Sequence, residues 1–208
     1  MGKKKAFFLL LLGLLLNRDY GDAVTLATLK DFHRRRVQVL AESGADLIAF
    51  ETISNKLEAY AELLEGDGIK IPTWFSFNYK DSVNIVGGDS FLECASVADS
   101  CNKIVAVGIN CTPPRFILDI VLLVHKLTPR VTSKPILIYP NIGETYDPDR
   151  KEWVVKSTGV SDKDFISYVS KWCEAKASLI GGCCRTTPNT IRAISRALSK
   201  YSSVLPSL

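Results

Sequence analysis

Two adjacent cysteines, Cys183 and Cys184, follow a short apolar run, and a third, Cys111, follows a similar run that ends at Asn110. Consecutive Cα atoms lie about 3.8 Å apart, whereas a disulfide usually spans roughly 4.4–6.8 Å. The adjacent pair therefore favours free thiols or metal ligands. Three thiolates at strand ends could hold a soft or borderline metal, zinc above all, and leave its fourth position open. Three core cysteines that bind nothing are an equally open interpretation of the same positions.

The chemistry of such a site follows from its ligands. A zinc ion held by three thiolates is electron-rich, and it is therefore a poor Lewis acid for hydrolysis. An incoming thiol can instead take the open position, lose its proton near neutral pH and stay nucleophilic. The three cysteines therefore predict alkyl transfer to sulfur. A helix that begins at Pro188 would direct its positive end toward the thiolates and favour their ionised form.

Helices and strands alternate along the chain from about residue 25, as judged from apolar periodicity and from glycine, proline and capping residues. The predicted helices cover 25–43, 55–65, 89–99, 115–127, 161–175 and 187–201. The predicted strands cover 45–50, 72–77, 104–109, 135–139 and 178–181. A long loop is expected over 143–159. The strands are short and continuously apolar, which is typical of buried parallel strands.

This alternation indicates an α/β fold with right-handed crossovers, either a doubly wound sheet or a (β/α)8 TIM-type barrel. The sequence lacks the Gly-x-Gly-x-x-Gly turn that would favour a dinucleotide fold. In a barrel, function gathers at the carboxyl ends of the strands. The polar and thiol residues lie at those ends: Glu51, Asn110, Cys111, Asn141, Cys183 and Cys184. Five strand–helix units in a fold that needs eight predict an incomplete barrel.

The net charge bears on nucleic-acid binding, and the number of cysteines bears on disulfide formation. The net charge is +4, and Lys3, Lys4 and Lys5 supply three of those charges, which leaves about +1 (4 − 3). That balance predicts no nucleic-acid partner. Six cysteines could suggest disulfides, but the chain is much longer than the small stapled domains in which that inference is strong. Cys94, Cys101 and Cys173 lie in helix-like apolar segments or beside them, and we expect them to be buried, inert thiols.

The first residues differ from the rest of the chain. A basic start is followed by the apolar run 6–16, which is shorter than the roughly 20 residues that cross a bilayer. Residues 1–16 could be a secretory signal or an anchor, although no Ala-x-Ala-like cleavage site follows them. We favour an atypical apolar segment over 1–18, joined to a truncated domain over 19–203. The expected location is cytoplasmic, without membrane association.

Two runs, Gly108–Cys111 and Gly181–Pro188, resemble the two zinc-ligand motifs of the homocysteine S-methyltransferase family. The similarity is closest to the plant-type members that use S-methylmethionine. Three further runs occur in the same order as in the family and support the resemblance, at residues 50–52, 74–78 and 139–144. The resemblance implies a (β/α)8 barrel with Zn²⁺ held by Cys111, Cys183 and Cys184. It also implies methyl transfer from S-methylmethionine, or S-adenosylmethionine, to homocysteine, which gives methionine.

Two further residues are candidates for substrate binding. The resemblance suggests that Glu51 binds the amino group of homocysteine, since a carboxylate at the barrel mouth pairs with an ammonium. The alternative is an exposed acid at a strand end. Asn110 could orient a ligand or the substrate through hydrogen bonds, and the alternative is an ordinary turn residue. Asn141 is a weaker candidate of the same kind.

The sequence also departs from the family pattern. The Asp-Gly-Gly motif of the first strand is absent, and so are the first two or three βα units. Lys176 stands where a glycine is expected before the last strand, and Ile142 stands where a small polar residue is usual. The alternative function is therefore a non-catalytic truncated remnant or splice product, with weak zinc binding or none.

Overall fold

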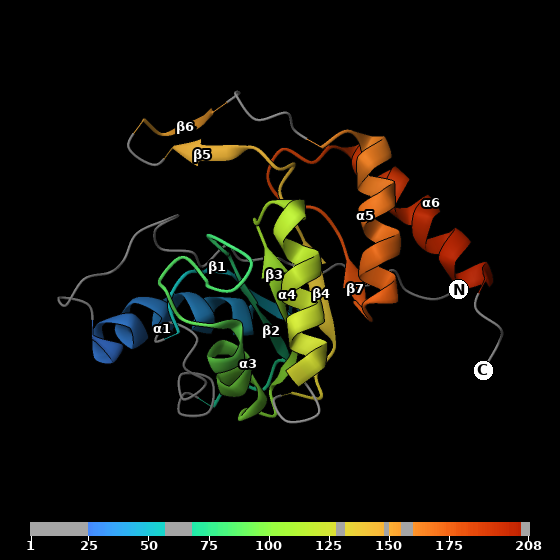
Figure 1. The fold of residues 1–208 in the computed structure, drawn as a ribbon. Coiled ribbons are helices and arrows are strands. Elements are labelled where there is room, and N and C mark those ends of the chain that lie inside the picture. Colours follow the sequence, from blue (N-terminus) through green and yellow to red (C-terminus); the bar gives the residue numbers. More distant parts are fainter. Residues whose placement is uncertain (1–24, 57–67, 128–131, 148–149, 155–159, 205–208) are drawn as a thin grey trace.

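Five parallel strands form one sheet in the order β1-β2-β3-β4-β7 (Figure 1). This computed structural model describes residues 25–56, 68–127, 132–147, 150–154 and 160–204. The strands are β1 (Ile48–Ile53), β2 (Thr73–Phe77), β3 (Ile104–Asn110), β4 (Ile136–Tyr139) and β7 (Leu179–Ile180). Their order in the sheet follows their order in the chain, as in a βα barrel. A doubly wound sheet reverses its strand order instead, so the structure confirms the predicted incomplete barrel.

The helices begin and end close to their predicted limits. They are α1 (Leu26–Glu42), α3 (Phe91–Asp99), α4 (Pro114–Leu127), α5 (Asp162–Glu174) and α6 (Pro188–Val204). Side chains of Thr25, Ser90 and Ser161 cap three of them by accepting a hydrogen bond from the third helical amide. The helix predicted over 89–99 begins later than predicted, because Ser90 is its cap and Phe91 its first residue. Most of the helix predicted over 55–65 lies outside the described residues.

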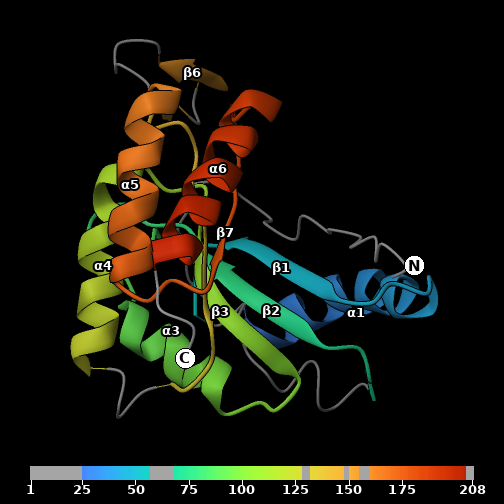
Figure 2. The same cartoon turned by 90° about the vertical axis from the view of Figure 1, so that its right-hand side faces the viewer.

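One face of the sheet packs against the helices, because alternate strand residues point to it. Phe50, Phe75 and Ile109 from the strands share this core with Ile120 of α4 and Trp172 of α5. All five described helices contribute side chains to the same core, and Figure 2 shows α4 and α5 together beside the sheet. The opposite face of the sheet therefore corresponds to the interior of a barrel.

The segment predicted as a loop over 143–159 contains a hairpin, which corrects that prediction. Strands β5 (Thr145–Asp147) and β6 (Glu152–Val154) pair in antiparallel fashion. Figure 1 shows them beyond the carboxyl ends of β3 and β4. Each strand has three residues, which is too short for an alternating pattern to predict it.

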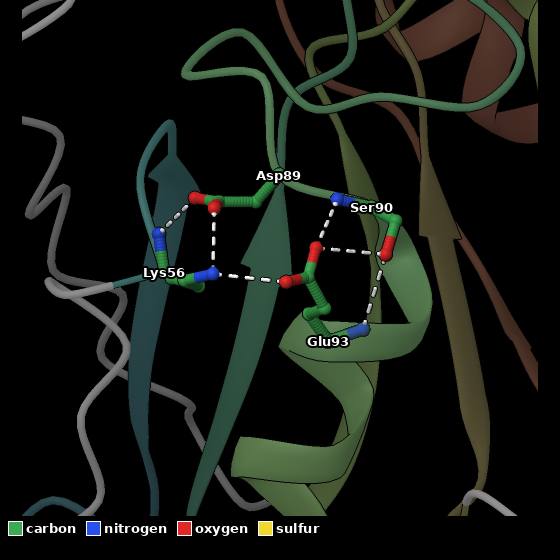
Figure 3. A network of polar contacts seen from close by, with 4 residues as sticks. All are labelled: Lys56, Asp89, Ser90 and Glu93. Atoms are coloured by element: carbon green, nitrogen blue, oxygen red, sulfur yellow. Dashed lines mark hydrogen bonds and ion pairs between the residues drawn. The ribbon is translucent and has the colours of Figure 1, made fainter.

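A polar network joins the end of β1 to the start of α3 (Figure 3). The Lys56 ammonium lies 3.2 Å from Asp89 Oδ1 and 2.9 Å from Glu93 Oε1. The backbone amide of Lys56 also donates to Asp89 Oδ2 at 2.9 Å. Ser90 and Glu93 cap α3 reciprocally, since the side chain of each accepts from the backbone of the other. The network therefore ties a strand end to the helix that follows the next strand.

All six cysteines lie within the described residues, and each is a free thiol. Cys94, Cys101 and Cys173 are buried, as predicted. Among the helices that the structure describes, none combines the length and apolar character needed to cross a membrane. The segment predicted over 1–18 lies outside the described residues, and the limit between it and the domain over 19–203 stays a prediction.

Candidate metal centre

The sulfur atoms of Cys111, Cys183 and Cys184 all lie within 4.8 Å of one another. Cys184 Sγ is 3.4 Å from Cys111 Sγ and 3.9 Å from Cys183 Sγ. A tetrahedral zinc ion with Zn–S bonds of about 2.3 Å would place its sulfur ligands about 3.8 Å apart. The donor set and its spacing therefore fit a zinc ion with three sulfur ligands and one open position.

Cys111 lies directly after β3 in an unusual backbone conformation. Its φ of +47° is in the left-handed region, which few residues other than glycine adopt. Its amide donates to the carbonyl oxygen of Tyr139 at 3.2 Å, and its own carbonyl accepts from Asn141 Nδ2 at 3.1 Å. These two hydrogen bonds hold the turn that directs the Cys111 side chain toward the other thiols.

Cys183 and Cys184 follow β7 and are fixed by backbone hydrogen bonds to the segment after β4. The amide of Cys183 donates to the carbonyl of Pro140 at 2.8 Å, and the carbonyl of Cys184 accepts from Ile142 at 3.3 Å. Thr186 Oγ1 donates to the Cys183 carbonyl at 2.6 Å. Gly182 allows this approach, because a Cβ there would lie 2.5 Å from Thr186 Oγ1.

The three thiols share their charge unequally. Hydrogen bonds from Cys111 and Cys183 lower the pKa of Cys184 to about 3. Hydrogen bonds to Cys183 and Cys184, with burial, raise the pKa of Cys111. The hydrogen bond from Cys111 lowers the pKa of Cys183. The hydrogen bond to Cys184, burial and the charge of Cys184 raise it by more, so that the pKa of Cys183 is about 11. Three thiolates this close need a cation before all can ionise.

Asn110 is fully buried at the end of β3, so it is not a turn residue. Its Oδ1 accepts from the amide of Thr52 at 2.9 Å, and its Nδ2 donates to Thr52 Oγ1 at 2.8 Å. Nδ2 also lies 4.0 Å from Cys183 Sγ. The amide therefore links β1 to one of the three thiols, and most of its hydrogen-bonding capacity is engaged within the protein.

Glu51 is also buried, with 2% of its surface exposed, which rejects the alternative of an exposed acid. It lies within β1, since that strand continues to Ile53. Within the described part of the chain, its Oε1 has no hydrogen-bond partner. Burial, and then the charge of Cys184, raise the pKa of Glu51 to about 7. A buried carboxylate with an unpaired oxygen beside a thiol cluster is a position that a cationic group of a ligand would stabilise.

Sequence reasoning did not assign a role to the aromatic residues beside this centre. Trp74 Nε1 donates to the hydroxyl of Tyr139 at 3.2 Å, and Ser76 Oγ is hydrogen-bonded to the same hydroxyl. Burial, and then the charge of Glu51, raise the pKa of Tyr139. Strand alternation gave a signal for Trp74 alone, because Trp74 and Ser76 alternate with the phenylalanines of β2.

Comparison with known proteins gives a consistent result. A family model described as homocysteine S-methyltransferase matches residues 5–198. The chain is 68% identical to homocysteine S-methyltransferase 2 of Arabidopsis thaliana over 187 residues, which are 89% of this chain and 55% of that protein. It is 66% identical to selenocysteine Se-methyltransferase of Brassica oleracea var. italica over 190 residues, 90% of this chain and 54% of that protein. The chain thus spans about half the length of the curated relatives it matches.

A solved structure shares the fold. The metallated form of the homocysteine methyltransferase MmuM from Escherichia coli superposes with a TM-score of 0.69 at 31% identity. The superposition covers 87% of this chain and 54% of that one. The apo form of MmuM gives a TM-score of 0.68 over 86% of this chain and 59% of that one.

Proposed function

Because the chain belongs to the homocysteine S-methyltransferase family, we propose that it transfers a methyl group from a sulfonium donor to homocysteine, with zinc held by Cys111, Cys183 and Cys184. The observation that carries the proposal is the distance between the three sulfurs, all within 4.8 Å. Three thiolates are the ligands that select zinc and leave one position for a substrate sulfur.

The zinc ion, when bound, would lower the pKa of the homocysteine thiol, so that the thiol loses its proton to solvent near neutral pH. The homocysteine sulfur then forms a bond to the donor methyl carbon. The bond between that carbon and the donor sulfur breaks, and its electron pair stays on the donor sulfur. Homocysteine becomes methionine, and the donor loses its positive charge. The donor is S-methylmethionine or S-adenosylmethionine.

Glu51 binds the amino group of homocysteine in this proposal. Its buried Oε1 has no hydrogen-bond partner among the residues that the structure describes, so an ammonium would provide the missing interaction. Asn110 acts on one of the cysteines that hold the zinc ion. It joins Thr52 to Cys183 and thereby orients that thiol, and its direct contact with homocysteine stays a prediction.

Zinc content per chain tests the proposal most directly. We expect about one zinc per purified chain, and loss of tight zinc in Cys111→Ser, Cys183→Ser and Cys184→Ser. Cys173→Ser is the matched control, because this buried cysteine lies in α5 outside the thiol cluster. Tight zinc in the Cys183→Ser protein would contradict the assignment.

A non-catalytic role is the second candidate, and the observation that favours it is that the sheet of the described residues does not close into a barrel. The chain covers 55% of the Arabidopsis protein, and its described sheet has five strands. Transfer of labelled methyl from S-methylmethionine to homocysteine separates the two candidates. A zinc-loaded, soluble sample without turnover would support the non-catalytic role. We propose a cytoplasmic location for either, since six free thiols suit a reducing compartment.

A further inference from the structure

A cavity of about 490 Å³ lies on the face of the sheet opposite the helices. Trp74, Leu137, Tyr139 and Gly182 are among the residues that line it. Gly182 directly precedes Cys183, and Tyr139 pairs in register with Asn110, the residue before Cys111. The cavity therefore adjoins the backbone that carries the three thiols.

Two aromatic rings, each with a polar atom, form part of the cavity wall. The rings of Trp74 and Tyr139 have centroids 6.3 Å apart and cross at 62°. The indole N–H donates to the Tyr139 hydroxyl at 3.2 Å, so each ring fixes the position of the other. Both side chains are only partly buried, and both border the cavity. The pair is thus a rigid aromatic surface that a ligand can reach.

The chemistry of this wall favours a cation that carries alkyl groups. Among the described residues that line the cavity, none is charged, so this part of the wall offers no salt bridge to an anion. Aromatic faces attract cations, and tryptophan does so most strongly. A sulfonium group is a compact cation bound to carbon on three sides, and it suits aromatic faces and an apolar wall together.

We propose that Trp74 and Tyr139 form the binding site for the sulfonium group of the methyl donor, an inference that rests on the proposed methyl transfer. The site would hold the donor methyl beside the thiol cluster. Transfer of the methyl moves an electron pair onto the donor sulfur and leaves a neutral thioether. The attraction to the rings ends with that charge, so the site would favour the charged donor over the uncharged product.

Calorimetry on the full, zinc-loaded chain tests this with two probes, S-methylmethionine and its neutral counterpart methionine. We expect Trp74→Leu to weaken S-methylmethionine binding roughly tenfold and Trp74→Phe to weaken it less, in keeping with the ranking of aromatic rings. Methionine binding, homocysteine binding and zinc content should stay at wild-type values. Trp153→Leu is the matched control, because Trp153 lies on β6 and is not part of the cavity wall.

Fluorinated tryptophan at position 74 separates attraction to the ring from a structural role. Fluorine withdraws charge from the ring face and changes its shape little, so S-methylmethionine affinity should fall stepwise with each added fluorine while methionine affinity stays constant. If Trp74→Leu does not fold, this series still tests whether the Trp74 ring attracts the sulfonium group. Equal losses for both probes, or no loss in either series, would overturn the inference.

Zinc content and homocysteine binding in the same samples keep the two proposals apart. A chain that binds zinc and homocysteine but not S-methylmethionine retains the proposed metal centre and rejects the sulfonium site. A chain that prefers S-methylmethionine through Trp74, yet holds no zinc, supports the sulfonium site and rejects the proposed function.

Discussion

Asn141 donates a hydrogen bond from Nδ2 to the carbonyl oxygen of Cys111 at 3.1 Å and so joins the segment after β4 to the segment after β3. Its Oδ1 accepts from the amide of Gly143 at 2.8 Å, so both ends of the side-chain amide are engaged. Cys111 has a φ of +47°, a conformation that persists only where its surroundings hold it. Asn141 therefore helps to fix the direction of a proposed zinc ligand without being a ligand itself.

We predict that Asn141→Ala weakens zinc binding about 10–100-fold, the usual cost of removing a residue that orients a metal ligand. Competition with a coloured chelator measures the affinity. Asn102→Ala is the control, because Asn102 is exposed in the turn before β3. Equal zinc affinity in Asn141→Ala and the wild type would show that Cys111 is held by the rest of its turn.

Glu51→Gln should weaken homocysteine binding about 10–100-fold and leave zinc content unchanged, since a hydrogen bond to a charged group contributes about 1.5–3 kcal/mol. Calorimetry with homocysteine and with 4-mercaptobutanoic acid, which lacks the amino group, gives the sharpest measurement. The variant and the wild type should bind the second compound equally. Glu174→Gln, at the exposed end of α5, is the matched control. An equal loss for both compounds would mean that Glu51 does not contact the amino group.

The positions of the three cysteines could be predicted because parallel strands bring their carboxyl ends to one edge of a sheet. Cys111 follows β3 and Cys183 follows β7, and these strands flank β4. Two separate apolar runs, each followed by cysteine, were therefore enough to place the thiols together. The burial of Glu51 was not predicted, because β1 extends three residues beyond the predicted strand end at Phe50.

The contacts of Trp74 and Tyr139 could not be predicted for a different reason. The two residues are 65 positions apart, and their contact depends on the stagger of neighbouring strands. Apolar strand patterns fix which face a side chain occupies, but they do not fix register between strands. The hairpin of β5 and β6 was missed because three-residue strands carry no readable pattern.

Lys176→Gly should stabilise the protein by about 0.5–1 kcal/mol. Lys176 has a φ of +65°, a backbone conformation that costs a residue with a side chain about 1–2 kcal/mol. Glycine removes this strain, but part of the gain is offset because glycine loses more conformational entropy on folding. Urea unfolding measures the change. Lys163→Gly is the matched control, because Lys163 lies within α5 and glycine there should destabilise by about 1 kcal/mol. Destabilisation in both variants would show that the Lys176 side chain makes a stabilising contact.

Glu93→Gln should lower stability near neutral pH but not in strong acid. Hydrogen bonds from Lys56, and then from Ser90, lower the pKa of Glu93 from 4.5 to about 2. The ionised carboxylate therefore stabilises the folded state above pH 4.5, and this contribution is lost as the pH falls toward 2. Urea midpoints at a series of pH values should show the two proteins diverging above pH 4.5 and converging near pH 2. Glu152→Gln, on β6 and outside the network of Figure 3, is the control. A constant difference between Glu93→Gln and the wild type from pH 7 to pH 2 would show that the charge of Glu93 contributes nothing.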